Sequence, residues 1–297
     1  MDMASHSAGE QSLLSSPPAH PDPPLADPHQ VSWPAKCELF GVEVTPTDYQ
    51  EASACILTAA KNAQSAVVSC HAVHALVTTA NDAELRTAAN QFDMITPDGQ
   101  PVRWALNALH GCGLQDRVYG PQLTLDVCEA AAEQGVPVYF YGGSEEAVGK
   151  MARNLRGKFP RLSIAGCESP PFRELTEAEE DAMVDRVNGS GAGIVMIGLG
   201  FPKQDIFAAR FRDRLNVVLM CVGAAFDFHA QLKSQAPSWM QAAGLEWLYR
   251  LCQEPRRLWK RYLVTNTHFL WKFAGALLRR KKATPKPNAQ HGCEECK

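Results

Sequence analysis

The sequence predicts an α/β fold: a Rossmann-like layered arrangement with a mainly parallel sheet, followed by a basic, aromatic helical appendage. Short apolar runs typical of buried strands alternate with helix-like segments, which is the pattern of a parallel sheet covered by helices. Several of these runs end in glycine or other small residues. After Leu245, basic residues are interleaved with tryptophan and other apolar residues at helical spacing.

Composition and charge narrow the class of protein. The chain has 297 residues, of which 45% are hydrophobic and 21% charged, as expected of a globular protein with a sizeable core. Its net charge of -3 argues against a general nucleic-acid binder. Residues 245–282 nevertheless hold ten Lys/Arg against two acids, a local charge of +8 that leaves -11 elsewhere. A basic end on an acidic body indicates that this end has its own partner.

The cysteines and the N-terminal segment indicate the compartment. Ten cysteines are scattered without the spacing of a secreted disulfide framework, which favours reduced thiols in a cytoplasmic protein. The chain begins without the basic and apolar regions of a signal peptide, and it has no uncharged apolar stretch long enough to span a membrane.

Four regions are predicted. Residues 1–36 are a proline-rich disordered leader, residues 37–244 the α/β domain, residues 245–282 the appendage and residues 283–297 a disordered tail. His291, Cys293 and Cys296 in the tail resemble half of a zinc site, but no second Cys/His pair lies nearby, so no metal site is predicted.

In the first half of the body, apolar periodicity predicts three strands and four helices. The first helix has a capping residue, Thr47 or Asp48, and the second strand turns polar at its far end. The predicted strands are 38–44, 65–71 and 92–95, and the predicted helices are 47–63, 72–90, 101–110 and 122–134.

The second half repeats the alternation. Thr176 and Glu179 have the spacing of a capping box, which marks the start of a helix. Three of the strands in this half lead directly into glycines or alanines. The predicted strands are 136–141, 162–166, 193–200 and 217–222, and the predicted helices are 144–155, 176–188 and 203–214.

Candidate site residues follow the predicted strands, because ligands of open parallel sheets gather at the carboxyl ends of the strands. Asp98 lies in a Pro-Asp-Gly turn that would hold its carboxylate at the rim, although it could also serve only to shape the turn. The candidates at strand ends and helix starts are Ser69, His71, Asp98, Arg117, Gly142, Gly143, Gln204 and Asp227.

The glycine pair has two interpretations. Gly142 and Gly143 lie between a strand and a helix, where backbone N–H groups and the helix dipole favour phosphate. The alternative is a tight turn that needs positive φ.

Taken together, these motifs resemble the WecG/TagA/CpsF family of glycosyltransferases. The resemblance covers about residues 38–273 and rests on motifs in the family's order: Ser69–His71, Thr96–Gly99, Arg117–Gly120, Tyr141–Gly143, Gly198–Gln204, Gly223–Phe228, Ala236–Pro237, Gly244–Arg250 and Glu254–Arg257. It implies a Rossmann-like enzyme that transfers a sugar, N-acetylmannosamine-type or related, from a UDP-sugar to a lipid-linked saccharide acceptor. It also implies that no metal or other cofactor is needed, in keeping with the absence of an Asp-x-Asp pair.

The resemblance also implies roles for individual residues. Asp98 matches the proposed catalytic base, and Ser69 matches a threonine of the family, so the hydroxyl is kept. His71 matches an asparagine, a departure that could alter donor preference or the pH profile. Arg117 and Gln204 match polar pocket residues, and Asp227 matches an acidic residue near the nucleotide. The appendage arginines that would close over the diphosphate are Arg250, Arg256 and Arg257.

Two other functions compete with this one. An NAD(P) oxidoreductase is disfavoured, because no strand is followed by Gly-x-Gly-x-x-Gly with an acid about twenty residues on. The departure at His71 leaves a second alternative open, which is a catalytically silent protein of the same fold that binds UDP-sugar or acts as a membrane adaptor.

The appendage and the assembly state also leave alternatives open. Basic, tryptophan-rich helices suit an anionic membrane surface, here the inner face of the cell membrane, but the aromatic stripe could instead pack on the body. A homo-oligomer is compatible with the sequence.

Overall fold

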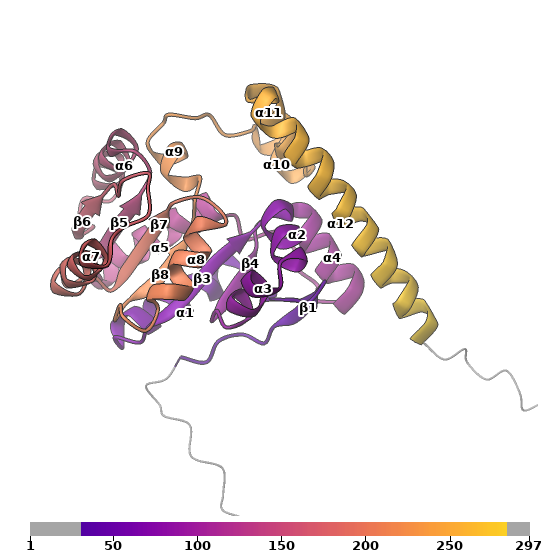
Figure 1. The fold of residues 1–297 in the computed structure, drawn as a ribbon, viewed down its shortest axis with the longest axis horizontal. Helices are drawn as coiled ribbons and strands as arrows, with labels where there is room; N and C mark the ends of the chain where they lie inside the picture. The colour runs from indigo at the N-terminus through magenta and orange to yellow at the C-terminus, as the bar shows by residue number, and fades with distance from the viewer. Residues whose placement is uncertain (1–30, 284–297) are drawn as a thin grey trace, which may run out of the picture. The chain divides into compact units, whose positions relative to one another are not determined.

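The computed structural model describes residues 31–283, which form one compact unit built around a parallel sheet (Figure 1). Six strands pair in parallel throughout, which confirms the predicted fold class. Their order across the sheet is β4 (Met94–Pro97), β3 (Ala66–His71), β8 (Val218–Cys221), β7 (Ile194–Gly198), β5 (Val138–Gly142) and β6 (Ile164–Glu168).

Helices cover both faces of the sheet, and the alternation of side chains along each strand divides the core in two. Val68, for example, belongs to one buried cluster and its neighbour Val67 to the other. One face packs against α1 (Tyr49–Lys61), α5 (Gly120–Gln134), α6 (Glu145–Lys158) and α9 (Ala225–His229). The other packs against α2 (Val73–Asn81), α3 (Ala83–Asn90), α4 (Gln100–His110), α7 (Glu177–Gly189) and α8 (Lys203–Phe211).

Two elements differ from the sequence prediction. Residues 38–44 are not one strand but a hairpin of β1 (Cys37–Leu39) and β2 (Val42–Val44), joined by Phe40 and Gly41, both with positive φ. The single helix expected over 72–90 is broken into α2 and α3 at Asp82, where the backbone is extended. The Asp82 side chain caps α3 by accepting a hydrogen bond from the amide of Leu85.

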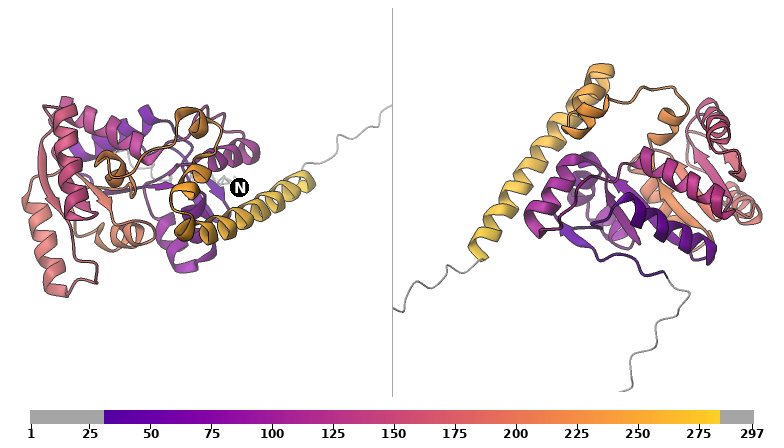
Figure 2. Two further views of the ribbon diagram at one scale, coloured as in Figure 1. Left: turned by 90° about the horizontal axis from the view of Figure 1, so that it is seen from above. Right: turned by 180° about the vertical axis from the view of Figure 1, so that it is seen from behind.

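The C-terminal segment forms three helices, α10 (Ser238–Ala242), α11 (Glu246–Gln253) and α12 (Pro255–Ala283). The long helix α12 packs across α2 and α4 (Figures 1 and 2). Its buried side is formed by Leu258, Thr265 and Phe269, and the Phe269 ring meets Phe40 of the hairpin edge-to-face with centroids 5.6 Å apart.

The opposite side of α12 carries exposed apolar side chains. We call these residues the outer face of α12: Trp259, Leu263, Leu270, Trp271 and Leu278. Trp271 is 81% exposed and Leu270 is 64% exposed. Helix α12 is therefore apolar on two sides, one packed on the body and one facing outward.

The described residues begin inside the predicted leader, at Val31, and end at the first residue of the predicted tail. Val31 and Trp33, which fall within the predicted leader, pack against the core formed with α1 and α5. The rest of the leader and the tail, including His291, Cys293 and Cys296, lie outside the described residues. No helix within residues 31–283 is long and apolar enough to cross a membrane.

Candidate active site

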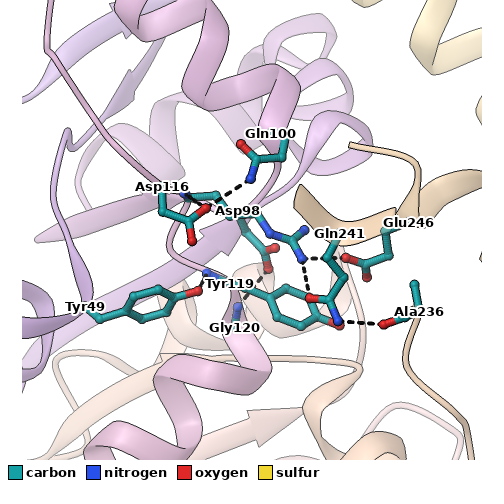
Figure 3. A network of polar contacts seen from close by, with 10 residues as sticks. Tyr49, Asp98, Gln100, Asp116, Tyr119, Gly120, Ala236, Gln241 and Glu246 are labelled. Atoms are coloured by element: carbon teal, nitrogen blue, oxygen red, sulfur yellow. Dashed lines mark hydrogen bonds and ion pairs between the residues drawn. The ribbon is translucent and has the colours of Figure 1, made fainter. Parts of the chain in front are cut away.

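Asp98 lies at the carboxyl edge of the sheet, between the end of β4 and the start of α4. The backbone amide of Asp98 holds this turn in place by donating to the carbonyls of Thr96 (3.0 Å) and His71 (3.1 Å). Its Oδ2 accepts a hydrogen bond of 3.1 Å from the amide of Gly120, in the first turn of α5 (Figure 3). The carboxylate therefore faces a helix N-terminus, which favours negative charge.

Burial nevertheless works against ionisation of this carboxyl. The pKa of Asp98 is raised from 3.8 to about 7, with burial as the largest cause and the nearby carboxylate of Glu246 acting in the same direction. Arg117, the Gly120 amide and Arg250 act in the opposite direction. A carboxyl with a pKa near neutrality can both accept and release a proton under physiological conditions, as a general base must.

Arg117 joins this site to the C-terminal helices. Its guanidinium donates to Glu246 of α11 at 2.7 Å and to Gln241 of α10 at 3.0 Å, and it lies over the Tyr119 ring, 4.2 Å from the centroid. Arg117 and Glu246 are both buried. Because a buried charge needs its partner, the pair fixes α10 and α11 beside Asp98.

A cavity of about 420 Å³ lies beside this cluster. It is bounded by α1, by the turns at the starts of α4 and α5, and by α10. Its wall is formed by Tyr49, Gln100, Asp116, Arg117, Tyr119, Pro121, Gln122, Leu125, Gln235, Ser238, Gln241 and Ala242.

The structure does not bring the side chains of Ser69 and His71 to Asp98. Both are fully buried and contact Asp205 of α8: the Ser69 hydroxyl lies 3.1 Å from each carboxylate oxygen, and His71 Nε2 lies 2.7 Å from Oδ2. Residues two apart on a strand point to the same face, here the α8 side. The β3 side chain near Asp98 is instead Cys70, which packs against the core on the α5 side.

Backbone conformation accounts for Gly142 and Gly143, and close backbone packing is a second reason at Gly142. Both have positive φ, and a Cβ on Gly142 would lie 2.7 Å from the backbone of Gly198 on β7. The following helix α6 is capped by Ser144 and already has Glu145 and Glu146 in its first turn. These facts support the tight-turn interpretation, and phosphate contact at this turn stays a prediction.

Gln204 and Asp227 lie in the first turns of the helices α8 and α9, which follow β7 and β8. Gln204 is buried in the first turn of α8, and its Oε1 has no hydrogen-bond partner among residues 31–283. A Cβ on Gly223 would lie 3.1 Å from that oxygen, so the amide closely approaches the turn after β8. Asp227 pairs with Lys233 at 2.8 Å, and Lys233 also lies 3.8 Å from Glu254.

The three appendage arginines have different surroundings. The guanidinium of Arg250 lies over the Phe228 ring, 5.8 Å from its centroid, and it is close enough to influence Asp98. Arg256 and Arg257 are exposed at the start of α12, where Arg257 pairs with Glu254.

Sequence reasoning missed several residues of the cluster. Glu246 and Gln241 were not assigned a role, because their contact with Arg117 depends on how α10 and α11 dock. Gly120 lies in the quoted Arg117–Gly120 motif, but its role as donor to Asp98 needs the three-dimensional arrangement. Among residues 31–283, no group of three or more His, Cys, Asp or Glu side chains could hold a metal ion.

Fold and site together define a Rossmann-like α/β protein with a titratable carboxylate at the carboxyl edge of its sheet. The family model described as Glycosyl transferase WecG/TagA/CpsF family matches residues 37–283. The chain therefore belongs to this family of glycosyltransferases.

Proposed function

We propose that the protein is an inverting, metal-independent hexosyltransferase of cell-surface polysaccharide synthesis. It transfers a sugar, N-acetylmannosamine-type or related, from a UDP-sugar to a polyprenyl-diphosphate-linked saccharide. Family membership supports the transferase class, and the environment of Asp98 is the observation that carries the mechanism.

In this mechanism, Asp98 accepts the proton of the acceptor hydroxyl as the hydroxyl oxygen attacks the anomeric carbon of the donor. The bond from that carbon to the diphosphate breaks on the opposite side, so the configuration inverts and UDP leaves with the bonding electron pair. The Gly120 amide orients the carboxylate for this step. Near neutral pH a pKa of about 7 leaves Asp98 ready to take up a proton.

The leaving UDP carries negative charge, for which arginines are suited. We assign this role to Arg250, with Arg256 and Arg257 joining it from the start of α12. Gln204 and Asp227 are proposed to contact the nucleotide, as is the glycine turn of Gly142 and Gly143. Ser69 is proposed to take part in catalysis and His71 in substrate binding, both through their contacts with Asp205.

The outer face of α12 is proposed to bind the anionic inner face of the cell membrane. Exposed tryptophans and leucines there share the helix with cations such as Arg256 and Lys260, a combination that suits the interface of an anionic bilayer. Membrane binding would bring the site to its lipid-linked acceptor.

The test of the catalytic proposal is a screen of UDP-sugars with lipid-linked acceptors, measuring UDP release. Asp98→Asn should reduce kcat by about a hundredfold or more while UDP-sugar binding is retained, because general-base catalysis contributes on this scale. Full activity in Asp98→Asn would refute the assignment of the base. UDP-sugar binding without transfer to any acceptor would favour the catalytically silent alternative.

A further inference from the structure

The cavity beside Asp98 has a wall rich in neutral hydrogen-bonding groups. Four side-chain amides line it, from Gln100, Gln122, Gln235 and Gln241, together with three hydroxyls, from Tyr49, Tyr119 and Ser238. The charged members of the wall are already engaged: Arg117 pairs with Glu246, and Asp116 accepts from Gln100 at 3.0 Å. The wall therefore offers many neutral donors and acceptors, and its one cation, Arg117, is neutralised by Glu246, which leaves the carboxylate of Asp116 as its remaining charge.

Two of these side chains have unfilled hydrogen-bonding capacity. Gln100 and Tyr119 are both more than nine-tenths buried, and Gln100 Oε1 and Tyr119 Oη have no hydrogen-bond partner among residues 31–283. A buried polar atom without a partner costs about 1–3 kcal/mol, so a hydrogen bond supplied to either atom would be stabilising. A ligand rich in hydroxyls is a partner of the kind both lack.

We propose that this cavity binds the neutral saccharide of the acceptor and presents its hydroxyl to Asp98, an inference that rests on the proposed function. Amides and hydroxyls are complementary to sugar hydroxyls and acetamido groups, and the Tyr49 and Tyr119 rings, with Pro121 and Leu125, supply apolar wall. The cavity is next to the base, since Gln100 follows Asp98 by two residues and Tyr119 precedes Gly120, its hydrogen-bond donor.

The charge of the wall separates acceptor from donor. A UDP diphosphate brings negative charge that needs cations, and Arg117, the cation of this wall, is already neutralised by Glu246. Arg250 lies outside the wall, over Phe228. The donor diphosphate is therefore expected to bind on the Arg250 side of Asp98, and the acceptor saccharide on the cavity side.

The first experiment measures binding directly in the full-length protein. Saturation-transfer NMR with methyl glycosides of neutral hexoses and N-acetylhexosamines should show saturable binding of at least one glycoside, unaffected by an excess of UDP-sugar. Displacement by UDP-sugar would assign the cavity to the donor sugar and overturn the acceptor proposal. Absence of binding across the panel would also overturn it.

The second experiment uses two substitutions in the wall. Ala242→Tyr fills the cavity from exposed helix α10, and Tyr119→Phe removes the unpartnered hydroxyl without changing the ring that supports Arg117. Both should weaken glycoside binding and raise the KM for the lipid-linked acceptor, by about tenfold for Ala242→Tyr, with the KM for UDP-sugar unchanged.

Matched controls are Ala243→Tyr, at the exposed C-cap that follows α10, and Tyr139→Phe, on strand β5 away from the cavity. Normal transfer with an unchanged acceptor KM in Ala242→Tyr would overturn the saccharide site and leave the proposed function standing. Glycoside binding by a protein that transfers no sugar would instead refute the proposed function while retaining a saccharide site.

Discussion

At the residue scale, the ionisation of Asp98 should set the pH dependence of activity. The pKa of this carboxyl is about 7 because burial disfavours its charged form. Only the ionised form can accept a proton, so kcat/KM should rise about tenfold per pH unit below pH 7 and level off above it. Steady-state rates across pH 5–9 test this, and a profile that is flat between pH 5 and pH 7 would contradict it.

The same shift makes Asp98 a source of instability at high pH. The raised folded-state pKa means that the folded state binds more protons than the unfolded state between about pH 4 and pH 7, so stability falls across this range. Asp98→Asn removes the effect and should be more stable than wild type by about 2 kcal/mol at pH 8, with no such gain near pH 4. Urea unfolding of both proteins at each pH measures the difference.

Gly120 provides a steric test of the same carboxylate. A Cβ at this position would lie 3.3 Å from Asp98 Oδ2 and 3.4 Å from the Cβ of Cys70, so one of them must move. Gly120→Ala should lower kcat/KM by about tenfold, because small displacements of a catalytic group are costly. Gly157→Ala on α6, where a Cβ meets no atom within 4 Å, is the control and should keep full activity.

At the element scale, strand β3 shows how far the sequence could predict the site. Its apolar run and polar end correctly indicated a buried parallel strand ending at His71. Alternation alone implies that Ser69 and His71 share a face and Cys70 faces the other way. Which face meets Asp98 depends on the placement of α5 and α8, and this is a tertiary property. For that reason the sequence could place His71 at the strand end, where its carbonyl accepts from the Asp98 amide, but could not show that its side chain turns to Asp205.

Hairpin β1–β2 was missed for a local reason. Two-residue hairpin turns need positive φ and are normally marked by Asn or Gly, whereas here the first turn residue is Phe40. Its ring packs on Phe269 of α12, so a contact with a distant element accompanies this unusual conformation.

Helix α11 should influence both stability and the pH profile through Glu246. Glu246→Gln neutralises the partner of buried Arg117 and should cost about 3–5 kcal/mol in unfolding free energy. Because the Glu246 charge raises the pKa of Asp98, the midpoint of the pH–rate profile should also move to lower pH. Glu177→Gln, at an exposed position on α7, is the control. An unchanged midpoint would show that Glu246 does not act on the base.

At the scale of the whole molecule, the outer face of α12 should decide membrane binding. Trp271→Glu places a charge on an 81% exposed apolar position and should weaken binding to vesicles containing phosphatidylglycerol by about tenfold or more. Thermal unfolding should be unchanged, because Trp271 faces away from the body. Vesicle flotation measures the effect.

The control for this prediction is Gly157→Glu, which adds the same charge at an exposed position on α6. Equal flotation of wild type and Trp271→Glu would contradict the assignment of this face to the membrane.

The sequence predicted the sheet and most of its helices, because periodicity and glycine-terminated strands are local signals. The docking of 245–282 was harder to predict. Tryptophan, leucine and phenylalanine side chains occur on all sides of α12. The composition of this helix therefore could not indicate which side packs on the body, as Phe269 does, and which is exposed, as Trp271 is. The packing interpretation is confirmed for the side that carries Leu258 and Phe269, and the membrane interpretation stays a prediction for the outer face of α12.

The pairing of Arg117 with Glu246 has a consequence for biosynthesis. The two residues are 129 positions apart in the sequence. A chain emerging from the ribosome therefore contains the strands, Asp98 and Arg117 before Glu246, the partner of Arg117, has been synthesised. Until α11 follows, Arg117 lacks its anchor and the wall of the cavity lacks α10. The nascent chain should therefore acquire its sheet early and the proposed acceptor cavity last, which would delay transfer to an acceptor until translation is nearly finished.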